Sequence, residues 1–335
     1  LLDSGMRVPL LIRFPEKWKN HSPAKAGQIV PRLVAFVDFA PTVLNLLGLP
    51  TPTHMQGIPF LGPQSDRART HVFGHRDRVD EVRALARSVR GKDFLYIRNY
   101  MPHLSYNQPT AWPDLGEIRH EFYRLAETGR MTPPQWHFAG PTRPAEELYD
   151  CRNDPQNLHN LIGSKEHRKV LQRMREKLNG HLRETRDLGF LPEFEAWQAF
   201  AGSSGWAVGQ SGSIDLEAIR TAASAVGLAG EKTLLANLGS ANPLIRYWGT
   251  IGLGALSSKP STASLNALEN ALLDSSPSVR IEAANALANH GITDIALPIL
   301  INELKHENLI VVTHAARTLE SVSYTHLRAH ETSQN

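Results

Sequence analysis

Apolar runs and one apolar helix face organise the first part of the chain. Residues 5–14 form an apolar run of strand length bounded by glycine and proline, which predicts a strand buried on both faces. In residues 38–48 the apolar side chains recur at three- and four-residue steps, which predicts a short helix with one buried face. Asp38 is its expected N-cap and Gly48 its expected terminator.

Between residues 70 and 150 the pattern changes to short strand-like runs. The expected strands are residues 70–74, 84–89, 94–99 and 146–150, with a hairpin turn at residues 90–93. Residues 100–143 form a long excursion with proline and aromatic side chains; loops of such length are usually functional or contain short helices. Residues 165–188 place apolar side chains at helical spacing among Lys, Arg and Glu. They predict one long amphipathic helix lying on the preceding sheet.

A Gly- and Ser-rich stretch follows. Residues 202–213 contain eight Gly or Ser among twelve residues and are the best candidate for a boundary. Trp206 and Val208 within the stretch leave two alternatives open, a flexible linker or a loop docked on the protein.

Beyond this stretch the chain repeats itself. Residues 243–246 match residues 277–280 at an offset of 34, and residues 282–287 match residues 314–319 at an offset of 32. This period predicts a solenoid of helix pairs and resembles HEAT repeats. The expected helices are residues 215–226, 231–238, 243–256, 262–273, 277–289, 293–305 and 309–320. Arg246 and Arg280, at equivalent positions, either line a concave surface for a protein partner or tie adjacent repeats by hydrogen bonds; we favour the second.

Composition and charge exclude several classes of protein. The 335 residues, 41% apolar and 21% charged, are typical of a soluble globular protein of about two domains. A net charge of +3 without a Lys/Arg block does not indicate a nucleic-acid or anionic-membrane partner. No stretch reaches the ~20 uninterrupted apolar residues that a membrane span needs. The single cysteine, Cys151, excludes an internal disulfide.

Both ends of the sequence have features of a cut chain. It opens at Leu1 with neither an initiator Met nor a signal-peptide pattern, so we expect further residues upstream. Residues 322–332 resemble the in-frame translation of a sequencing-library adaptor. We therefore treat residues 321–335 as an artefact tail and leave them out of the fold prediction.

The first ~195 residues resemble the C-terminal part of the type I sulfatases, near the heparan N-sulfatase-like members of this family in the alkaline phosphatase superfamily. The resemblance is carried, in order, by residues 2–15, 36–44, 55–61, 76–81, 87–90, 96–100, 147–150 and 153–155. It implies an alkaline-phosphatase-like α/β fold: the end of the large sheet, then a small antiparallel sheet with a long helix. An all-α helical-repeat solenoid would follow.

The resemblance and the patterns together give five expected segments. They are the end of the catalytic α/β domain (residues 1–62), an α+β subdomain (63–195), a linker or docked loop (196–213), HEAT-like repeats (214–320) and the artefact tail (321–335).

The resemblance also implies the chemistry of the whole protein. In this family the nucleophile is a formylglycine made within a Cys/Ser-x-Pro-x-Arg motif, and acidic and amide side chains hold Ca²⁺. A divalent cation stabilises the negative charge on the sulfuryl oxygens. Neither Cys151 nor Ser275 stands in such a motif. We therefore expect the catalytic residues and metal ligands upstream of residue 1 and none in this chain, and a periplasmic or extracellular whole protein.

What this chain can contribute is a wall of the substrate pocket. The candidate substrate-binding residues are His75, Arg76, Arg78, Asp80, Glu81 and His103. Arg recognises sulfate and carboxylate through paired hydrogen bonds, and His can donate to a bridging oxygen. A solvated, salt-bridged turn is the alternative for residues 75–81, and ordinary packing under the excursion is the alternative for His103.

The favoured function is hydrolysis of sulfate esters or N-sulfates on carbohydrate by the whole protein, with the fragment itself inactive. A phosphodiesterase or phosphonate hydrolase of the same superfamily is one alternative. A helical-repeat interaction module with a protein partner is the other.

Overall fold

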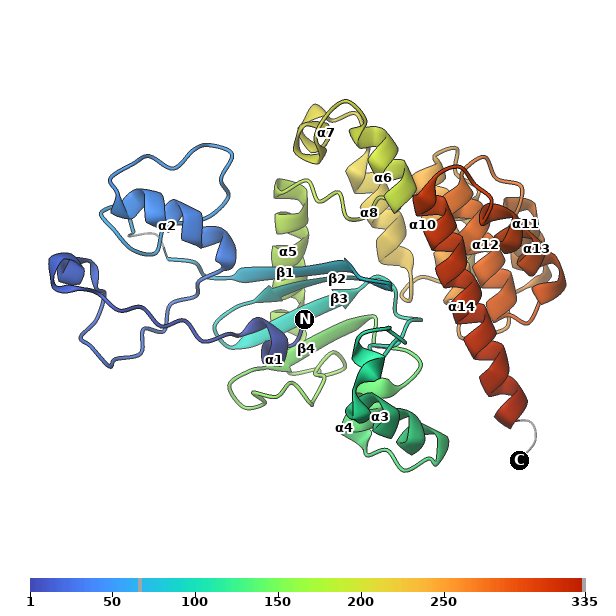
Figure 1. The fold of residues 1–335 in the computed structure, drawn as a ribbon, viewed down its shortest axis with the longest axis horizontal. Helices are drawn as coiled ribbons and strands as arrows, with labels where there is room; N and C mark the ends of the chain where they lie inside the picture. The colour runs from blue at the N-terminus through green and yellow to red at the C-terminus, as the bar shows by residue number, and fades with distance from the viewer. Residues whose placement is uncertain (66–67, 333–335) are drawn as a thin grey trace. The chain divides into compact units, whose positions relative to one another are not determined.

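The computed structural model describes residues 1–65 and 68–332, with side chains as far as residue 322 (Figure 1). The chain divides into two compact units. Unit 1 comprises residues 1–76, 87–98 and 146–179, and unit 2 comprises residues 77–86, 99–145 and 180–335. None of the positions at which the chain passes from one unit to the other falls within residues 196–213. The domain boundaries expected from the sequence stay a prediction.

The small antiparallel sheet is confirmed. Its strands β1 (Val72–Val79), β2 (Val82–Arg90), β3 (Phe94–Asn99) and β4 (Glu146–Asp150) follow each other in the order β1-β2-β3-β4. In the antiparallel β3–β4 pair Tyr96 lies opposite Leu148. The long helix α5 (Arg168–Glu184) joins β4 through Arg175, whose Nε donates to Glu146 Oε1 at 2.7 Å.

The strand expected at residues 5–14 is wrong. The structure has a short helix α1 (Asp3–Met6), and residues 7–15 then run without regular structure, with Leu11 88% exposed. A strand requires a neighbour that satisfies its backbone groups, and no other described strand lies beside this run. The apolar pattern was therefore insufficient to form the strand here.

The helix expected at residues 38–48 is present, but Asp38 has another role. A 3₁₀ turn η2 (Phe36–Asp38) leads into α2 (Phe39–Leu46), and a further 3₁₀ turn η1 (Glu16–His21) precedes them. Asp38 makes no side-chain cap on α2; its buried carboxylate accepts from Ala35 N, Ile58 N at 2.8 Å and Arg69 Nε at 2.6 Å. Burial opposes its ionisation, but the bond from Arg69 and the two amides outweigh it and lower the pKa of Asp38. Asp38 thus joins three segments of unit 1.

In unit 2, short helices divide the long excursion. They are η3 (Pro113–Leu115), α3 (Glu117–Glu127) and α4 (Pro133–Ala139). Arg119 fixes the start of α3, since its Nε donates to Asp114 Oδ1 at 2.7 Å and its Nη2 to Gln108 O at 2.6 Å. The expectation of short helices within this excursion is confirmed.

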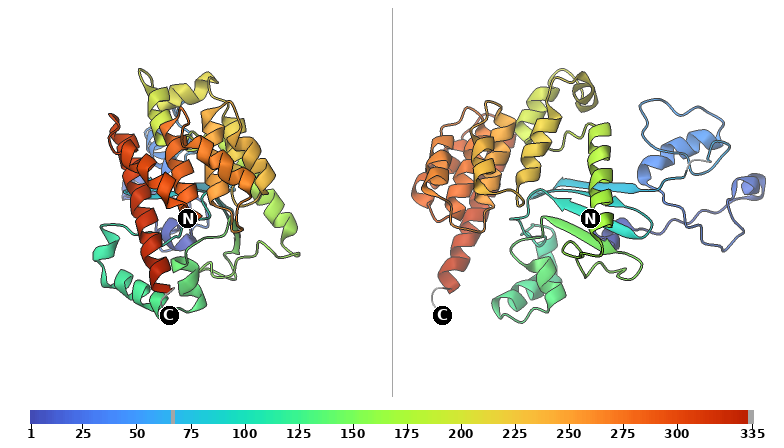
Figure 2. Two further views of the ribbon diagram at one scale, coloured as in Figure 1. Left: turned by 90° about the vertical axis from the view of Figure 1, so that its right-hand side faces the viewer. Right: turned by 180° about the vertical axis from the view of Figure 1, so that it is seen from behind.

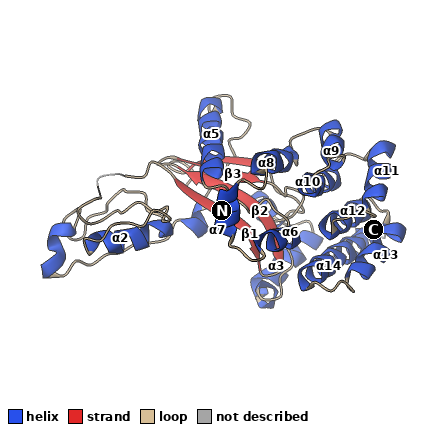
Figure 3. Ribbon diagram, turned by 90° about the horizontal axis from the view of Figure 1, so that it is seen from above, coloured by secondary structure: helices blue, strands red, loops and turns tan. Residues whose placement is uncertain are grey.

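The helical repeats are also confirmed. Their helices are α8 (Leu216–Ala225), α9 (Glu231–Leu238), α10 (Pro243–Gly254), α11 (Thr262–Ala271), α12 (Pro277–Asn289), α13 (Thr293–Glu303) and α14 (Leu309–Thr332). Successive members of the series α8, α10, α12 and α14 pack on each other, with α9, α11 and α13 along the other side (Figures 2 and 3). The last helix is longer than the expected residues 309–320. A Cβ on Gly249 would lie 2.4 Å from Leu238 N, so α10 approaches α9 too closely for any larger residue.

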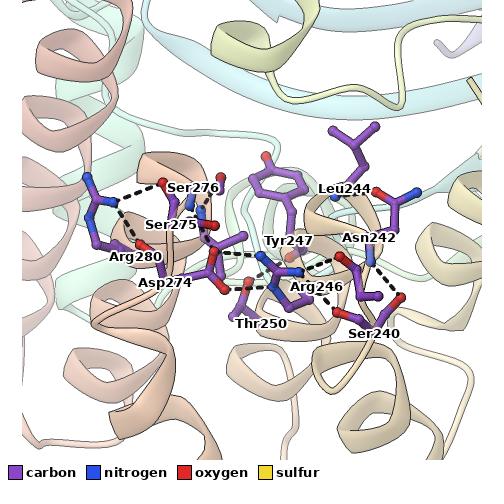
Figure 4. Close-up of polar contacts among 12 residues, drawn as sticks. Ser240, Asn242, Leu244, Arg246, Tyr247, Thr250, Asp274, Ser275, Ser276 and Arg280 are labelled. Carbon is purple, nitrogen blue, oxygen red and sulfur yellow. Dashed lines mark hydrogen bonds and ion pairs between the residues drawn. The ribbon is translucent and has the colours of Figure 1, made fainter.

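Two arginines tie adjacent repeats together, as favoured from the sequence (Figure 4). Arg246 on α10 donates from Nε and Nη2 to the Asp274 carboxylate, at 2.6 and 2.8 Å. Arg280 on α12 donates to Glu303 Oε1 at 2.6 Å and to the Asp274 carbonyl at 2.8 Å. Because Asp274 lies in the turn between α11 and α12, it connects both arginines.

The Gly- and Ser-rich stretch contains a helix. After α6 (Glu193–Phe200), Ser204 caps α7 (Gly205–Ser211), and Arg186 Nη1 donates to the carbonyls of Gly209 and Gln210, each at 2.9 Å. Trp206, which suggested docking, is 62% exposed. The stretch is therefore held to the segment after α5 by Arg186 and not by Trp206.

Candidate functional site

The candidate residues 75–81 form the end of strand β1 and the hairpin turn that follows it. The strand expected to end at residue 74 continues to Val79, and Asp80 and Glu81 form the turn into β2. Asp80 has a φ of 48°, in the left-handed region that two-residue hairpin turns use. Alternate side chains of a strand point to opposite faces, so these residues do not form one compact cluster. Residues 75–78 are four consecutive polar positions, so no alternation in the sequence indicated that the strand continues to Val79.

The side chains near the turn have partners within unit 2. Arg78 Nε donates to Glu193 Oε1 at 2.6 Å, and both side chains are about half exposed. The Glu81 carboxylate accepts from Ala111 N, which is the main cause that lowers the pKa of this exposed carboxyl group. Arg78 and Glu81 therefore form part of a salt-bridged turn while keeping exposed surface for a ligand.

Two other candidate residues belong to unit 1. His75 is exposed, and Arg76 is half-buried with a buried Nε that lacks a hydrogen-bond partner among the described residues. Because this nitrogen is buried, an added anion could reach it only if the surrounding side chains moved.

His103, the remaining candidate, lies in unit 2 after β3. It is half-buried, and its buried Nδ1 has no partner in the described part of the chain. Burial, opposed by the charge of Glu282 and reinforced by those of Arg143 and Arg83, lowers the pKa of His103 to about 4. The imidazole is therefore neutral near pH 7.

A buried polar cluster near His103 escaped the sequence analysis. Arg83 on β2 donates to Glu282 Oε1 on α12 at 2.5 Å and to the Tyr247 hydroxyl on α10. His314 Nε2 on α14 lies 2.8 Å from the same oxygen of Glu282. Burial disfavours the ionised carboxyl, but Arg83 and His314 outweigh it and hold the pKa of Glu282 far below its usual range. The sequence contained one sign of this cluster: Glu282 and His314 stand at equivalent positions of two repeats.

No catalytic residue was expected in this chain. Cys151 and Ser275 are the two side chains that were compared with the nucleophile motif in the sequence. Cys151 is buried in unit 1, and burial raises the pKa of its thiol to about 11, which disfavours the reactive thiolate. Ser275 lies on the turn before α12, where its carbonyl accepts from Arg280. Within the described residues, no three His, Cys, Asp or Glu side chains are grouped to hold a metal ion. The described helices include none that is both long and apolar enough to span a membrane.

Two segments of the chain match family models. Residues 1–107 match the model described as N-sulphoglucosamine sulphohydrolase, C-terminal. Residues 231–320 match the model of HEAT repeats. The first match contains β1, β2 and β3, and the second runs from α9 into α14.

Curated relatives give the same result for the first part of the chain. An ulvan-active sulfatase of Formosa agariphila is 36% identical over 195 residues, which cover 58% of this chain and 32% of that protein. The human N-sulphoglucosamine sulphohydrolase is 24% identical over 215 residues, 55% of this chain and 38% of that protein. The chain thus spans about a third of the length of these relatives.

Solved structures of sulfatases also match in part. A sulfatase from Bacteroides thetaiotaomicron superposes with a TM-score of 0.29 at 19% identity, covering 45% of this chain and 25% of that one. A 2-O GAG sulfatase gives a TM-score of 0.29 at 20% identity, with the same coverage of both chains. From the family models and the curated relatives, the first part of this chain is a segment related to the C-terminal region of sulfatases, and HEAT repeats follow it.

Proposed function

We propose that this chain is part of a carbohydrate sulfatase, and that the whole protein hydrolyses sulfate esters or N-sulfates on a sulfated saccharide. The observation that carries the proposal is the 36% identity over 195 residues to an ulvan-active sulfatase. The C-terminal N-sulphoglucosamine sulphohydrolase model supports it independently. These matches favour a sulfatase over the phosphodiesterase or phosphonate hydrolase alternative. The resemblance to this family supports a periplasmic or extracellular location for the whole protein.

The contribution of this chain would be binding and not the chemical step. Ca²⁺ and formylglycine are implied by the resemblance for the whole protein. The described residues contain no group of three His, Cys, Asp or Glu side chains that could hold a metal ion, and the sequence contains no Cys/Ser-x-Pro-x-Arg motif. No step of the hydrolysis is therefore assigned to these residues. Arg78 offers a half-exposed guanidinium to a sulfate, while Asp80 and Glu81 offer acceptors for sugar hydroxyls.

Residues 1–62 would complete a larger α/β domain in the whole protein. Among them are several exposed large apolar side chains, including Leu11, Ile29 and Phe36. Exposed apolar side chains are typical of a surface that another part of a protein covers when they lie together in one patch. The proposed boundary at residue 62 would place this face with the catalytic domain.

Saccharide binding by this chain tests the proposal. We expect a sulfated ulvan oligosaccharide to bind more tightly than its desulfated form in calorimetry, without release of sulfate. Loss of a charge-assisted hydrogen bond in Arg78→Ala should weaken binding about 10-fold. Arg124→Ala on α3 is the control, because Arg124 is a similarly exposed arginine paired with Glu121. Equal affinity for both saccharides, or equal loss in both variants, would contradict a binding role for Arg78.

A further inference from the structure

The end of the β1–β2 hairpin contacts the helical repeats within unit 2. Arg83, two residues beyond the turn, reaches α10 through Tyr247, α12 through Glu282 and α14 through His314. One guanidinium therefore contacts three successive helices of the solenoid. The polar groups of the three helices therefore meet at one point.

The ion pair between Arg83 and Glu282 is largely buried. The Glu282 side chain is only 4% exposed and that of Arg83 is 28% exposed. A buried carboxylate that loses its cation is left uncompensated, so the pair holds the hairpin in one position relative to these helices. The Arg83 carbonyl in turn accepts from Gln108 Nε2 at 2.8 Å, which extends the support to the excursion.

Further contacts lie on either side of Arg83. Arg317 on α14 donates from Nε to the Glu81 carbonyl at 3.1 Å. Arg78 pairs with Glu193 on α6, and Glu195 of the same helix binds the hydroxyls of Ser276 and Ser278 at the start of α12. The hairpin end is thus tied at three positions, directly or through α6, to the repeats.

We propose that the HEAT repeats act within their own chain as a scaffold that positions the substrate-binding hairpin, with Arg83, Glu282 and Arg317 as positioning residues. The role in substrate binding rests on the proposed function; the mechanical role does not. The face formed by α10, α12 and α14 at this point is occupied by the chain itself. This assigns the repeats a partner in cis, in contrast to the interaction-module alternative.

Hydrogen exchange of the full chain tests the mechanical role. Glu282→Gln removes the charge but keeps the volume of the side chain, and should speed amide exchange in residues 77–86 by about tenfold. Glu269→Gln, at an exposed position of α11, is the control and should change nothing. Unchanged exchange of residues 77–86 in a folded Glu282→Gln variant would overturn the proposal.

A second pair of variants covers the case in which Glu282→Gln does not fold. Arg317→Gln removes the bond to the Glu81 carbonyl, whereas Glu320→Gln removes only the other partner of Arg317. Faster exchange of the hairpin in the first variant alone supports the scaffold, and equal exchange in both overturns it.

Saccharide binding by the same variants separates this inference from the proposed function. If the wild-type chain binds the sulfated oligosaccharide, Arg317→Gln should weaken that binding several-fold, and Arg317→Lys should restore part of it. If the wild type does not bind but the hairpin responds in exchange, the proposed function fails and the scaffold stands. Normal binding with a loosened hairpin would overturn the claim that the scaffold serves the substrate.

Discussion

Burial disfavours the charged form of two neighbouring ionisable residues of unit 2, His103 and Glu282, but only His103 becomes neutral. It favours neutral His103, and no described residue accepts or donates at Nδ1 to offset this effect. Glu282 is also buried, yet Arg83 and His314 keep it ionised. The two residues differ because Glu282 receives hydrogen bonds that stabilise its charged form, whereas no described residue forms such a bond with His103 Nδ1.

His103 should make the stability of the protein depend on pH. The unfolded chain takes up a proton below the ordinary pKa of 6.5, whereas folded His103 does so only near a pKa of about 4. Above pH 6.5 the titration of His103 leaves the free energy of unfolding unchanged. As the pH drops from 6.5 to 4, the unfolded chain binds the proton more readily than the folded one, so the free energy of unfolding falls by at most ~3 kcal/mol. Urea unfolding of the wild type and of His103→Gln at several pH values measures this difference. A constant difference between the two proteins from pH 7 to pH 4 would refute it.

Cys151 should react slowly with thiol reagents. Its thiol is buried, and the rise of its pKa from 9.0 to about 11 lowers the thiolate fraction about 100-fold near pH 8. Because it is the only cysteine of the chain, the release of colour from a disulfide reagent reports on it alone. We expect slow reaction in native buffer and fast reaction in urea; equally fast reaction in both would show that the thiol is accessible.

At the scale of elements, the repeats depend on arginines that cross from one helix pair to the next. Arg246 contacts both Asp274 and the carbonyls of Ser240 and Ala241, at 3.0 and 2.9 Å. Arg246 therefore connects two turns. One precedes its own helix α10, and the other precedes α12, which begins at Pro277. Stability of this array is a sum over such neighbouring contacts.

Arg246→Ala should destabilise the repeats. Asp274 would keep its buried charge but lose a two-bond partner, at a cost of about 2–4 kcal/mol in the free energy of unfolding. Lys232→Ala, at an exposed position of α9, should cost less than about 0.5 kcal/mol. Denaturation of these variants and of Arg246→Ala/Asp274→Ala gives the coupling energy of the pair. Additive effects of the two substitutions would show that the bonds contribute little.

The accuracy of the sequence-based predictions differs between kinds of element. The repeat helices depend on local periodicity and first-turn prolines, so their positions were predicted closely. Residues 5–14 have the apolar pattern of a strand, but strand formation depends on a neighbour that no local pattern specifies. The contacts of Arg83 join residues far apart in the chain, and the sequence of β2, which has three arginines, does not identify their partners. The substrate-binding role of residues 75–81 and His103 stays a prediction.

At the scale of the whole chain, unit 2 joins segments that are distant in sequence. Residues 77–86 and 99–145 lie in the same compact unit as the repeats. Besides the Arg83 cluster, Trp248 on α10 donates from Nε1 to the Phe190 carbonyl at 2.9 Å, and Trp248 is almost fully buried. The repeats are thus bound to residues that precede the Gly- and Ser-rich stretch.

Cleavage in that stretch should therefore nick the protein without releasing the repeats. Residues 201–204, just before α7, are exposed and are the expected first site for a protease of broad specificity. The contacts of Arg83 with Glu282, of Phe190 with Trp248 and of Glu195 with Ser278 all cross this site in sequence. The two pieces should separate on a denaturing gel but elute together in size-exclusion chromatography, and Arg83→Ala should loosen their association. Elution of a free repeat fragment from the nicked wild type would show that these contacts do not hold the hairpin and the repeats together.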